Sequence, residues 1–259
     1  MLMLTFSCQV PGPRRCLLEV AGYSHSVDPV SGDHVDLVLN GSGTRLTMIL
    51  GDATGHGAKA GMIATEVVGI IRSLATEGPP PHRILARANQ TLSGRVPSGF
   101  ICVVIVQIDL LTREATYSSA GRVGFHFRRG ASTVRLHSDS LPLGFKPEEK
   151  YELCVLGMID IDEIIALFSD GVDETLCRSG HQLGTKVVID QIERSRGLRA
   201  IDIAKRVEGI RSQHQGYGPI LDDVSLLVLK ISESPRRRGA LTPQGNQCAS
   251  IPELAVTAG

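Results

Sequence analysis

The sequence predicts an α+β fold, a four-layer α-β-β-α sandwich in which two antiparallel sheets pack together and helices cover their outer faces. Three observations support this prediction. Segments with helical spacing of apolar residues come in neighbouring pairs, strand-like segments follow one another in a long central run, and one more apolar strand closes the patterned part. Paired helices argue against alternating βαβ units, in which each pair of parallel strands is joined by its own crossover.

The first part of the chain predicts three strands and then two helices. Apolar and β-branched runs place the strands at residues 16–25, 35–40 and 45–50. Gly41-Ser-Gly-Thr44 has the composition of a tight turn and predicts a hairpin between the last two strands. Apolar residues then recur at helical spacing from Gly57 to Gly78, where a Gly-Pro-Pro-Pro run ends the helix, and a second helix is expected over residues 84–92.

The middle of the chain changes to strand periodicity. Strands are expected at residues 100–108, 114–119, 123–128, 133–137, 151–156 and 164–169. The short turns between them predict an antiparallel meander. Two further helices, around residues 187–192 and 201–207, precede a last strand at residues 224–231.

These elements define one domain over residues 16–232. Residues 1–15 are expected to form a short lead. Residues 233–259 are rich in Pro, Gly and Ser, which predicts a disordered tail.

Composition excludes several classes of function. Lys+Arg and Asp+Glu both number 27 and Trp is absent, so neither charge nor aromatic content favours a nucleic-acid partner. No apolar run reaches the ~18 to 20 residues that a membrane helix needs. The start lacks the features of a signal peptide, and the six scattered cysteines fit neither a zinc site nor a disulfide framework. A reduced, cytoplasmic setting without membrane contact is predicted.

Aspartates at the ends of predicted strands are the strongest chemical feature. Asp33, Asp52, Asp170 and Asp222 lie in separate parts of the chain, and three of them border strongly apolar strands. Any one of them taken alone is better explained as a helix cap or a turn residue. Taken together, they fit hard divalent cations, which prefer oxygen ligands, provided that the strands bring their ends to one rim.

Six motifs occur in an order that resembles a known family. They are Ser31-Gly-Asp33-His-Val-Asp36, Gly51-Asp-Ala-Thr-Gly-His-Gly57, Ser119-Ala-Gly121, Leu141-Pro-Leu-Gly144, Phe168-Ser-Asp-Gly-Val-Asp-Glu174 and Asp222-Asp-Val-Ser225. In this order the chain resembles the SpoIIE/RsbU branch of the PP2C-like (PPM) serine/threonine phosphatases over nearly all of residues 20–231. The resemblance implies the same α-β-β-α sandwich and a phosphoprotein phosphatase that uses two Mn²⁺ or Mg²⁺ ions.

The resemblance also implies a set of metal ligands. Asp33 and Asp52 would bridge the two cations, and the backbone carbonyl of Ala53 would add a ligand. Asp170 and Asp222 would complete the shell of one cation. Hydrolysis in such a site proceeds without a covalent intermediate, so Asp33 and Asp52 count as catalytic through the ions they hold.

Four further residues match the family pattern with other roles. Asp223 is an additional candidate ligand at a position where many relatives have asparagine. His56 is a candidate proton donor to the leaving group, although such a loop histidine more often packs or forms hydrogen bonds. Asp36 and Glu174 are expected to act outside the metal shell. The sequence departs from the family at Ser31, His34, Val35 and Arg122, none of which is a predicted ligand.

The implied substrate is a phosphorylated STAS-domain protein (anti-anti-sigma-like) in bacterial partner switching, a stress-response type of signalling, with a separate activator protein as a possible regulator. The alternative is a catalytically weak or inactive module of the same fold that binds a partner. A second phosphatase signature, Cys8-x5-Arg14, is attributed to coincidence, because Pro11 and Pro13 lack the N–H groups that a phosphate loop needs.

Overall fold

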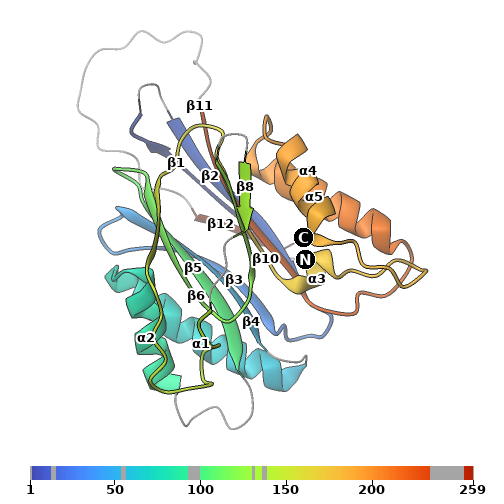
Figure 1. Ribbon diagram of the computed structural model, residues 1–259, viewed down its shortest axis with the longest axis horizontal. Coiled ribbons are helices and arrows are strands. Elements are labelled where there is room, and N and C mark those ends of the chain that lie inside the picture. Colours follow the sequence, from blue (N-terminus) through green and yellow to red (C-terminus); the bar gives the residue numbers. More distant parts are fainter. Residues whose placement is uncertain are drawn as a thin grey trace.

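The computed structural model describes residues 2–12, 16–53, 57–92, 100–129, 132–135, 139–233 and 254–258. Within them, two antiparallel sheets pack face to face and helices cover each outer face (Figure 1). The predicted α-β-β-α sandwich is confirmed. No helix in these residues is long and apolar enough to span a bilayer.

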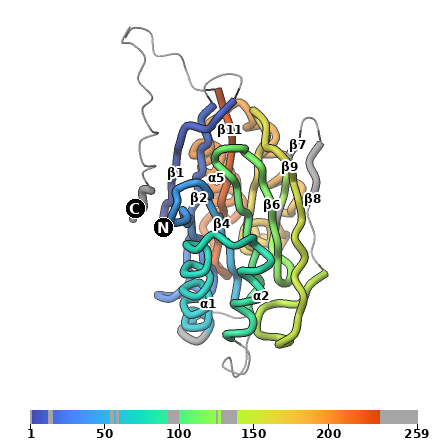
Figure 2. The backbone as a smooth tube through the Cα atoms, turned by 90° about the vertical axis from the view of Figure 1, so that its left-hand side faces the viewer, coloured from blue at the N-terminus to red at the C-terminus, as the bar shows by residue number. Residues whose placement is uncertain are grey.

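One sheet has five strands in the order β3-β4-β5-β6-β9. The strands are β3 (Asp33–Leu39), β4 (Arg45–Ala53), β5 (Ile101–Asp109), β6 (Glu114–Ala120) and β9 (Cys154–Met158). Two helices, α1 (Ala58–Glu77) and α2 (Pro81–Leu92), cover its outer face. Figure 2 shows these two helices lying next to each other on that side of the molecule.

The other sheet has seven strands in the order β12-β1-β2-β11-β10-β7-β8. The strands are β1 (Leu2–Val10), β2 (Cys16–His25), β7 (Gly124–Arg129), β8 (Ser132–Arg135), β10 (Ile164–Phe168), β11 (Val224–Glu233) and β12 (Leu254–Ala258). The helices α4 (Thr185–Arg194) and α5 (Ala200–Gln215) pack on its outer side, and the single turn α3 (Asp170–Asp173) follows β10 directly.

Alternation along the strands divides the apolar side chains between two layers. In β4, Met48 and Leu50 are fully buried between the two sheets, where Leu227 and Leu229 of β11 belong to the same core. Ile49, between Met48 and Leu50, belongs instead to the core under α1 and α2. The two-residue period of a strand therefore fills both sides of the sheet.

The structure places parts of both predicted flanking segments in the seven-stranded sheet. Strand β1, within the expected lead, pairs antiparallel with β2 and buries Leu4, Phe6 and Val10. Leu254–Ala258, within the expected disordered tail, pairs with β1. Residues 234–253 and 259 lie outside the described residues. Backbone pairing with an available sheet edge is the physical reason why these segments are ordered.

The predicted meander is wrong, because the chain passes from one sheet to the other three times, after β6, after β8 and after β9. β6 pairs with β5 and β9, whereas β7 pairs with β10 in the opposite sheet. The chain therefore crosses between sheets after Ala120, where Gly121 has a left-handed backbone (φ 72°). Strand periodicity marks each strand but does not say which sheet it joins.

Candidate functional site

The β3–β4 hairpin brings two predicted ligands together. Its register pairs Asp33 directly with Asp52 at the end of the hairpin opposite its turn. The turn has the predicted position, with the N–H of Asn40 donating to the carbonyl of Arg45 at 3.0 Å. A slip of either strand by one residue would turn the side chains of that strand to the opposite face, so the apolar pattern of the hairpin fixes this pair.

The end of the neighbouring sheet supplies the other acidic residues. β10 and β11 pair antiparallel, so Asp170, just after β10, and Asp222, just before β11, lie at the same edge. The N–H of Ser169 donates to the carbonyl of Ser225 at 3.0 Å, and the N–H of Ser225 donates to Ser169 Oγ at 3.0 Å. The pairing thus continues up to the first residue of α3.

Gly171 allows α3 to lie directly against the start of β11. A Cβ atom at this position would lie 2.0 Å from the carbonyl oxygen of Asp223. That separation is far inside van der Waals contact with backbone, so only glycine fits without displacing one of the two segments. The Asp-Gly pair is therefore explained by this close approach rather than by a turn alone.

The two edges meet around Asp33. This side chain is only 5% exposed. Burial raises the pKa of Asp33 to about 7, the hydroxyls of Ser169 and Ser225 offset part of the rise, and the charges of Asp223 and Asp170 add to it. One oxygen, Oδ2, is buried without a hydrogen-bond partner among the described residues.

Asp52 and Asp170 experience the same crowding of negative charge. Burial raises the pKa of Asp52 to about 8, and four other carboxylates raise it further; they are Asp33, Asp170, Asp222 and Asp223. Burial also raises the pKa of Asp170, with Asp222 as the next cause. Like charges held near one another favour protonation or a bound cation.

Asp223 differs from the other carboxylates because the protein itself uses both of its oxygens. Oδ1 accepts the N–H of Val27 at 2.8 Å. Oδ2 accepts the Ser31 hydroxyl at 2.9 Å, the N–H of Gly32 at 2.6 Å and the N–H of Asp33 at 3.3 Å. Through these hydrogen bonds the carboxylate holds the loop before β3 against the start of β11. The same contacts keep Asp33 in place.

The donor set fits a hard divalent cation, but the ligand sphere is not closed by protein atoms. Among the described residues, no three His, Cys, Asp or Glu side chains already converge as a set of metal ligands. The carboxylates do interact with one another, and Asp33 offers a buried oxygen to which no described residue forms a hydrogen bond. Mg²⁺ typically keeps several waters and takes one or two carboxylates, which suits this open arrangement.

Four predicted residues remain, and each has a different place in the structure. Ala53 follows Asp52 and ends β4 at the same rim, whereas His56 lies outside the described residues. Asp36 accepts two contacts from Arg72 of α1 at 2.6 and 2.5 Å and so joins α1 to β3. Glu174 is exposed and lines a pocket beside Asp222.

Sequence analysis did not identify Ser169 and Ser225 as part of the site. Both hydroxyls lower the pKa of Asp33; Ser169 directly follows β10, and Ser225 is the second residue of the neighbouring strand β11. A signal was present, since each serine is adjacent to an apolar strand and within three residues of a predicted ligand. Serine is also a common turn residue at the boundaries of strands, so the signal is weak.

Comparison with solved structures shows the same fold in other proteins. The SiaA-PP2C domain of Pseudomonas aeruginosa matches with a TM-score of 0.71 at 17% identity, over 82% of this chain and 84% of that one. The RsbU and RsbW domains of Rv1364c from Mycobacterium tuberculosis match with a TM-score of 0.69 at 23% identity, over 88% of this chain and 63% of that longer chain. RsbX in complex with magnesium matches with a TM-score of 0.64 at 15% identity, over 87% of this chain and all of that one (100%).

Sequence comparison gives the family. The chain finds no match among curated proteins at the sequence level. The family model of Stage II sporulation protein E (SpoIIE) matches residues 42–232, which is more than half of the chain and includes both the β4 and β11 ends of the site. The chain therefore belongs to the SpoIIE family, and its fold is that of a PP2C phosphatase domain.

Proposed function

We propose that this protein is a metal-dependent phosphatase that hydrolyses phosphoserine or phosphothreonine on a protein, using Mn²⁺ or Mg²⁺. The observation that carries the proposal is the gathering of Asp33, Asp52, Asp170 and Asp222 at one rim, with a buried oxygen of Asp33 that has no hydrogen-bond partner in the part of the chain that the structure describes. A buried carboxylate such as Asp33, surrounded by other carboxylates, is costly, so a cation is the simplest compensation. Membership of the SpoIIE family supports the same chemistry.

Two cations would be held by these four carboxylates and the carbonyl of Ala53. When bound, they would lower the pKa of a coordinated water and offset negative charge on the phosphoryl oxygens. We leave Asp223 out of this ligand set, because both of its oxygens already accept hydrogen bonds from the protein. RsbX, a protein of similar fold, was solved in complex with magnesium.

The chain's own residues would keep Asp33 in place for this role. The hydroxyls of Ser169, just after β10, and Ser225, in β11, favour its ionised form, and Asp223 accepts the backbone N–H of Asp33 itself. Such fixed geometry lowers the reorganisation needed during reaction. His56 remains our candidate for protonating the departing seryl oxygen.

The substrate we propose is a phosphorylated STAS-domain-like protein of a bacterial partner-switching system, located in the cytoplasm. The similarity to a protein that combines RsbU and RsbW domains supports this class. A separate activator protein is a possible regulator. The balanced charge of the chain gives no support for a nucleic-acid partner.

Release of phosphate from a phosphoserine protein, with and without Mn²⁺, tests the proposal. We expect hydrolysis that needs the metal and that falls at least 100-fold in Asp52→Asn, in line with the loss of a charge-stabilising group. Asp190→Asn, at a partly exposed position on α4, is the matched control and should keep full activity. Mn²⁺-independent binding of a partner without any hydrolysis would instead favour a binding module.

A further inference from the structure

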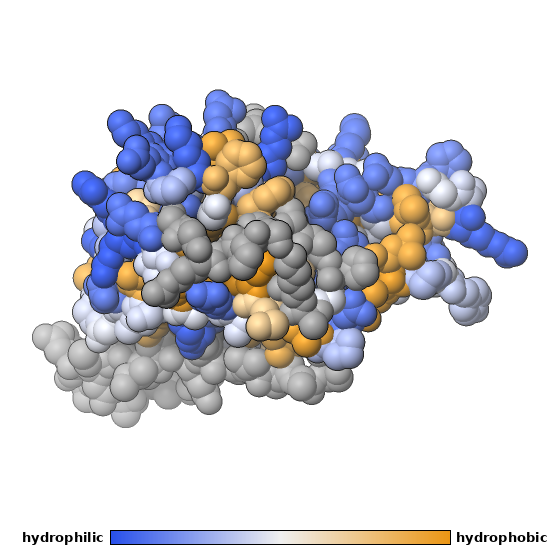
Figure 3. Space-filling model, turned by 90° about the horizontal axis from the view of Figure 1, so that it is seen from below, coloured by the Kyte–Doolittle hydropathy of each residue, from blue (hydrophilic) through white to orange (hydrophobic). Residues whose placement is uncertain are grey.

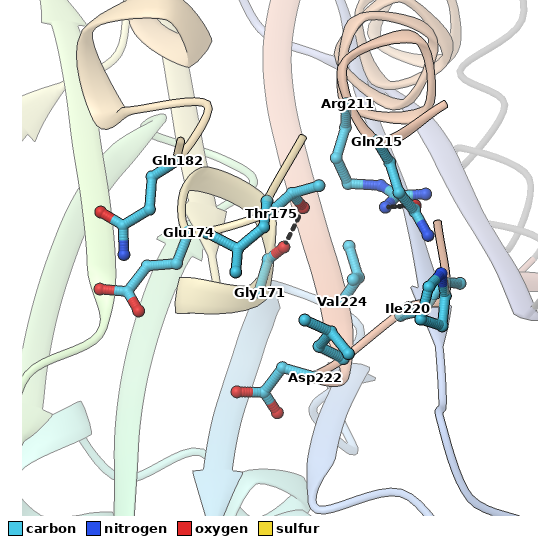
Figure 4. Close-up of a pocket in the computed structure, with 12 residues that line it drawn as sticks. Gly171, Glu174, Thr175, Gln182, Arg211, Gln215, Ile220, Asp222 and Val224 are labelled. Carbon is cyan, nitrogen blue, oxygen red and sulfur yellow. Dashed lines mark hydrogen bonds between the residues drawn. The ribbon is translucent and has the colours of Figure 1, made fainter. Parts of the chain in front are cut away.

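A pocket of about 210 Å³ adjoins the acidic rim (Figure 4). Its walls come from α3 and the segment after it, the end of α5 and the loop before β11. Its lining includes Glu174, Leu176, Arg211, Gln215, Leu221 and Asp222. Asp222 thus belongs to both the pocket and the proposed metal site, and the volume is smaller than that of most small-molecule pockets.

The far wall of the pocket is held by a buried network. Arg211 is 2% exposed and donates to both Glu208 oxygens at 2.8 and 2.7 Å and to Gln215 Oε1 at 2.7 Å. Gln215 in turn donates to the carbonyl of Gly218 at 2.7 Å. These contacts fix the loop that leads to Asp222, so the pocket is formed before any ligand arrives.

The near wall is fixed in the same way. Thr175 Oγ1 donates to the carbonyl of Gly171 at 2.6 Å, and the N–H of Leu183 donates to the carbonyl of Thr175 at 3.0 Å. Figure 4 shows the carboxylates of Glu174 and Asp222 on one side of the pocket and Arg211 with Gln215 on the other.

The chemistry of the walls selects an apolar occupant. The charge of Arg211 is compensated by Glu208, and Glu174 and Asp222 repel anions, so this pocket is a poor site for the phosphate itself. Leu221 is 64% exposed at the pocket and Leu176 is 38% exposed. These side chains offer apolar surface at the pocket, against which an apolar side chain of a ligand can pack. Figure 3 shows that, on the face it draws, apolar side chains reach the surface among hydrophilic ones.

We infer that this pocket receives an apolar side chain of the phosphorylated protein, from the segment next to the phosphoserine. The inference rests on the proposed function, which places the phosphoryl group against Asp222 and its neighbours. Because Asp222 also lines the pocket, a side chain a few residues from the phosphoserine can reach it, at ~3.3–3.6 Å per extended residue. The pocket would thereby select among phosphorylated sequences.

Phosphoserine peptides test the inference. In a nine-residue peptide with central phosphoserine, otherwise glycine and serine, a single leucine is moved through the other eight positions. We expect leucine at one position, or at two adjacent ones, to raise kcat/KM about tenfold over the leucine-free peptide in the presence of Mn²⁺. Equal rates for all peptides would overturn the inference.

Two variants assign the preference to the pocket. Leu221→Ser should reduce the leucine preference from about tenfold to nearly one. Leu111→Ser is the matched control, since Leu111 is 62% exposed and follows β5 at the end of the sheet opposite Asp52. It should leave the preference unchanged, and thermal unfolding should show both variants folded. A preference that survives Leu221→Ser would also overturn the inference.

The same assay separates this inference from the proposed function. If neither p-nitrophenyl phosphate nor any peptide is hydrolysed with Mn²⁺, the phosphatase proposal itself fails, and the pocket inference falls with it. If both are hydrolysed without regard to leucine, the phosphatase proposal stands and only the pocket inference fails.

Discussion

Replacing Asp223 with alanine removes the acceptor for four hydrogen bonds that hold the loop before β3. Two of the donors, the N–H groups of Gly32 and Asp33, belong to buried residues, whereas Val27 is 40% exposed and water can reach it. A hydrogen bond to a charged group contributes about 1.5–3 kcal/mol. If only the two buried donors are counted, the free energy of unfolding should fall by about 4 kcal/mol. Removing one negative charge from the acidic cluster should offset a small part of this loss.

Asp223→Asn gives a sharper comparison, because it keeps one acceptor oxygen. That oxygen can serve Ser31, Gly32 and Asp33, while the amide turns toward Val27 and loses only that bond. We expect the free energy of unfolding of Asp223→Asn to be lower than that of the native protein by about 1 kcal/mol. At about 2–4 °C per kcal/mol for a domain of this size, the alanine variant should melt about 8–16 °C lower and the asparagine variant about 2–4 °C lower.

Thermal unfolding followed by far-ultraviolet circular dichroism, in EDTA and again with Mn²⁺, measures both variants. If Asp223 holds the loop through hydrogen bonds and does not bind the metal, Asp223→Asn should also retain the rise in Tm that Mn²⁺ gives the native protein. The reasoning is refuted if the alanine variant melts within about 3 °C of the native protein, or if the asparagine variant loses its response to Mn²⁺.

Two further predictions concern packing at and near the site. Gly171→Ala should lower the free energy of unfolding, measured in urea, by at least about 3 kcal/mol, because the new Cβ would lie 2.0 Å from the carbonyl oxygen of Asp223. Gly209→Ala, on an open face of α5, should instead raise the free energy of unfolding by about 1 kcal/mol. Equal effects of the two glycine changes would contradict the close approach. Arg72→Met should lower the free energy of unfolding by about 2 kcal/mol, because it removes the cation that pairs with buried Asp36. Adding Asp36→Asn should recover part of this loss. Strict additivity of the two changes in a double-mutant cycle would contradict the ion pair.

Much of the fold could be predicted because its strands and helices have clear apolar periods. β10 is buried at all five positions and β11 at eight of its ten, so these strands are recognisable without their neighbours. The hairpin turn at residues 41–44 was equally clear. These features depend on local sequence, which a single chain displays.

Other parts of the fold depend on partners that are distant in sequence. β1 carries an alternating pattern, with Leu4, Phe6 and Val10 buried, and this signal could have identified it as a strand. The crossing between sheets after β6 has no such signal, because β7 is as strand-like as β6. The partner of a strand is decided by packing over the whole domain, so local pattern could not supply it.

The aspartates of the site were recognisable, but their separate roles were not. Asp222 and Asp223 are adjacent and chemically identical, yet Asp222 is exposed at the rim while Asp223 is 5% exposed and accepts four hydrogen bonds. The direction of each side chain follows from the start of β11 and from the loop it anchors. The residue type alone therefore does not predict which of the two aspartates faces the rim and which holds the loop.

Diffraction from crystals soaked in Mn²⁺, with an anomalous difference map, tests the central claim most directly. The account predicts two manganese peaks bounded by Asp33, Asp52, Asp170 and Asp222, with Asp223 still accepting the N–H groups of the loop before β3. A map with no peak at this rim, or with Asp223 turned away from the loop to bind manganese, would contradict it.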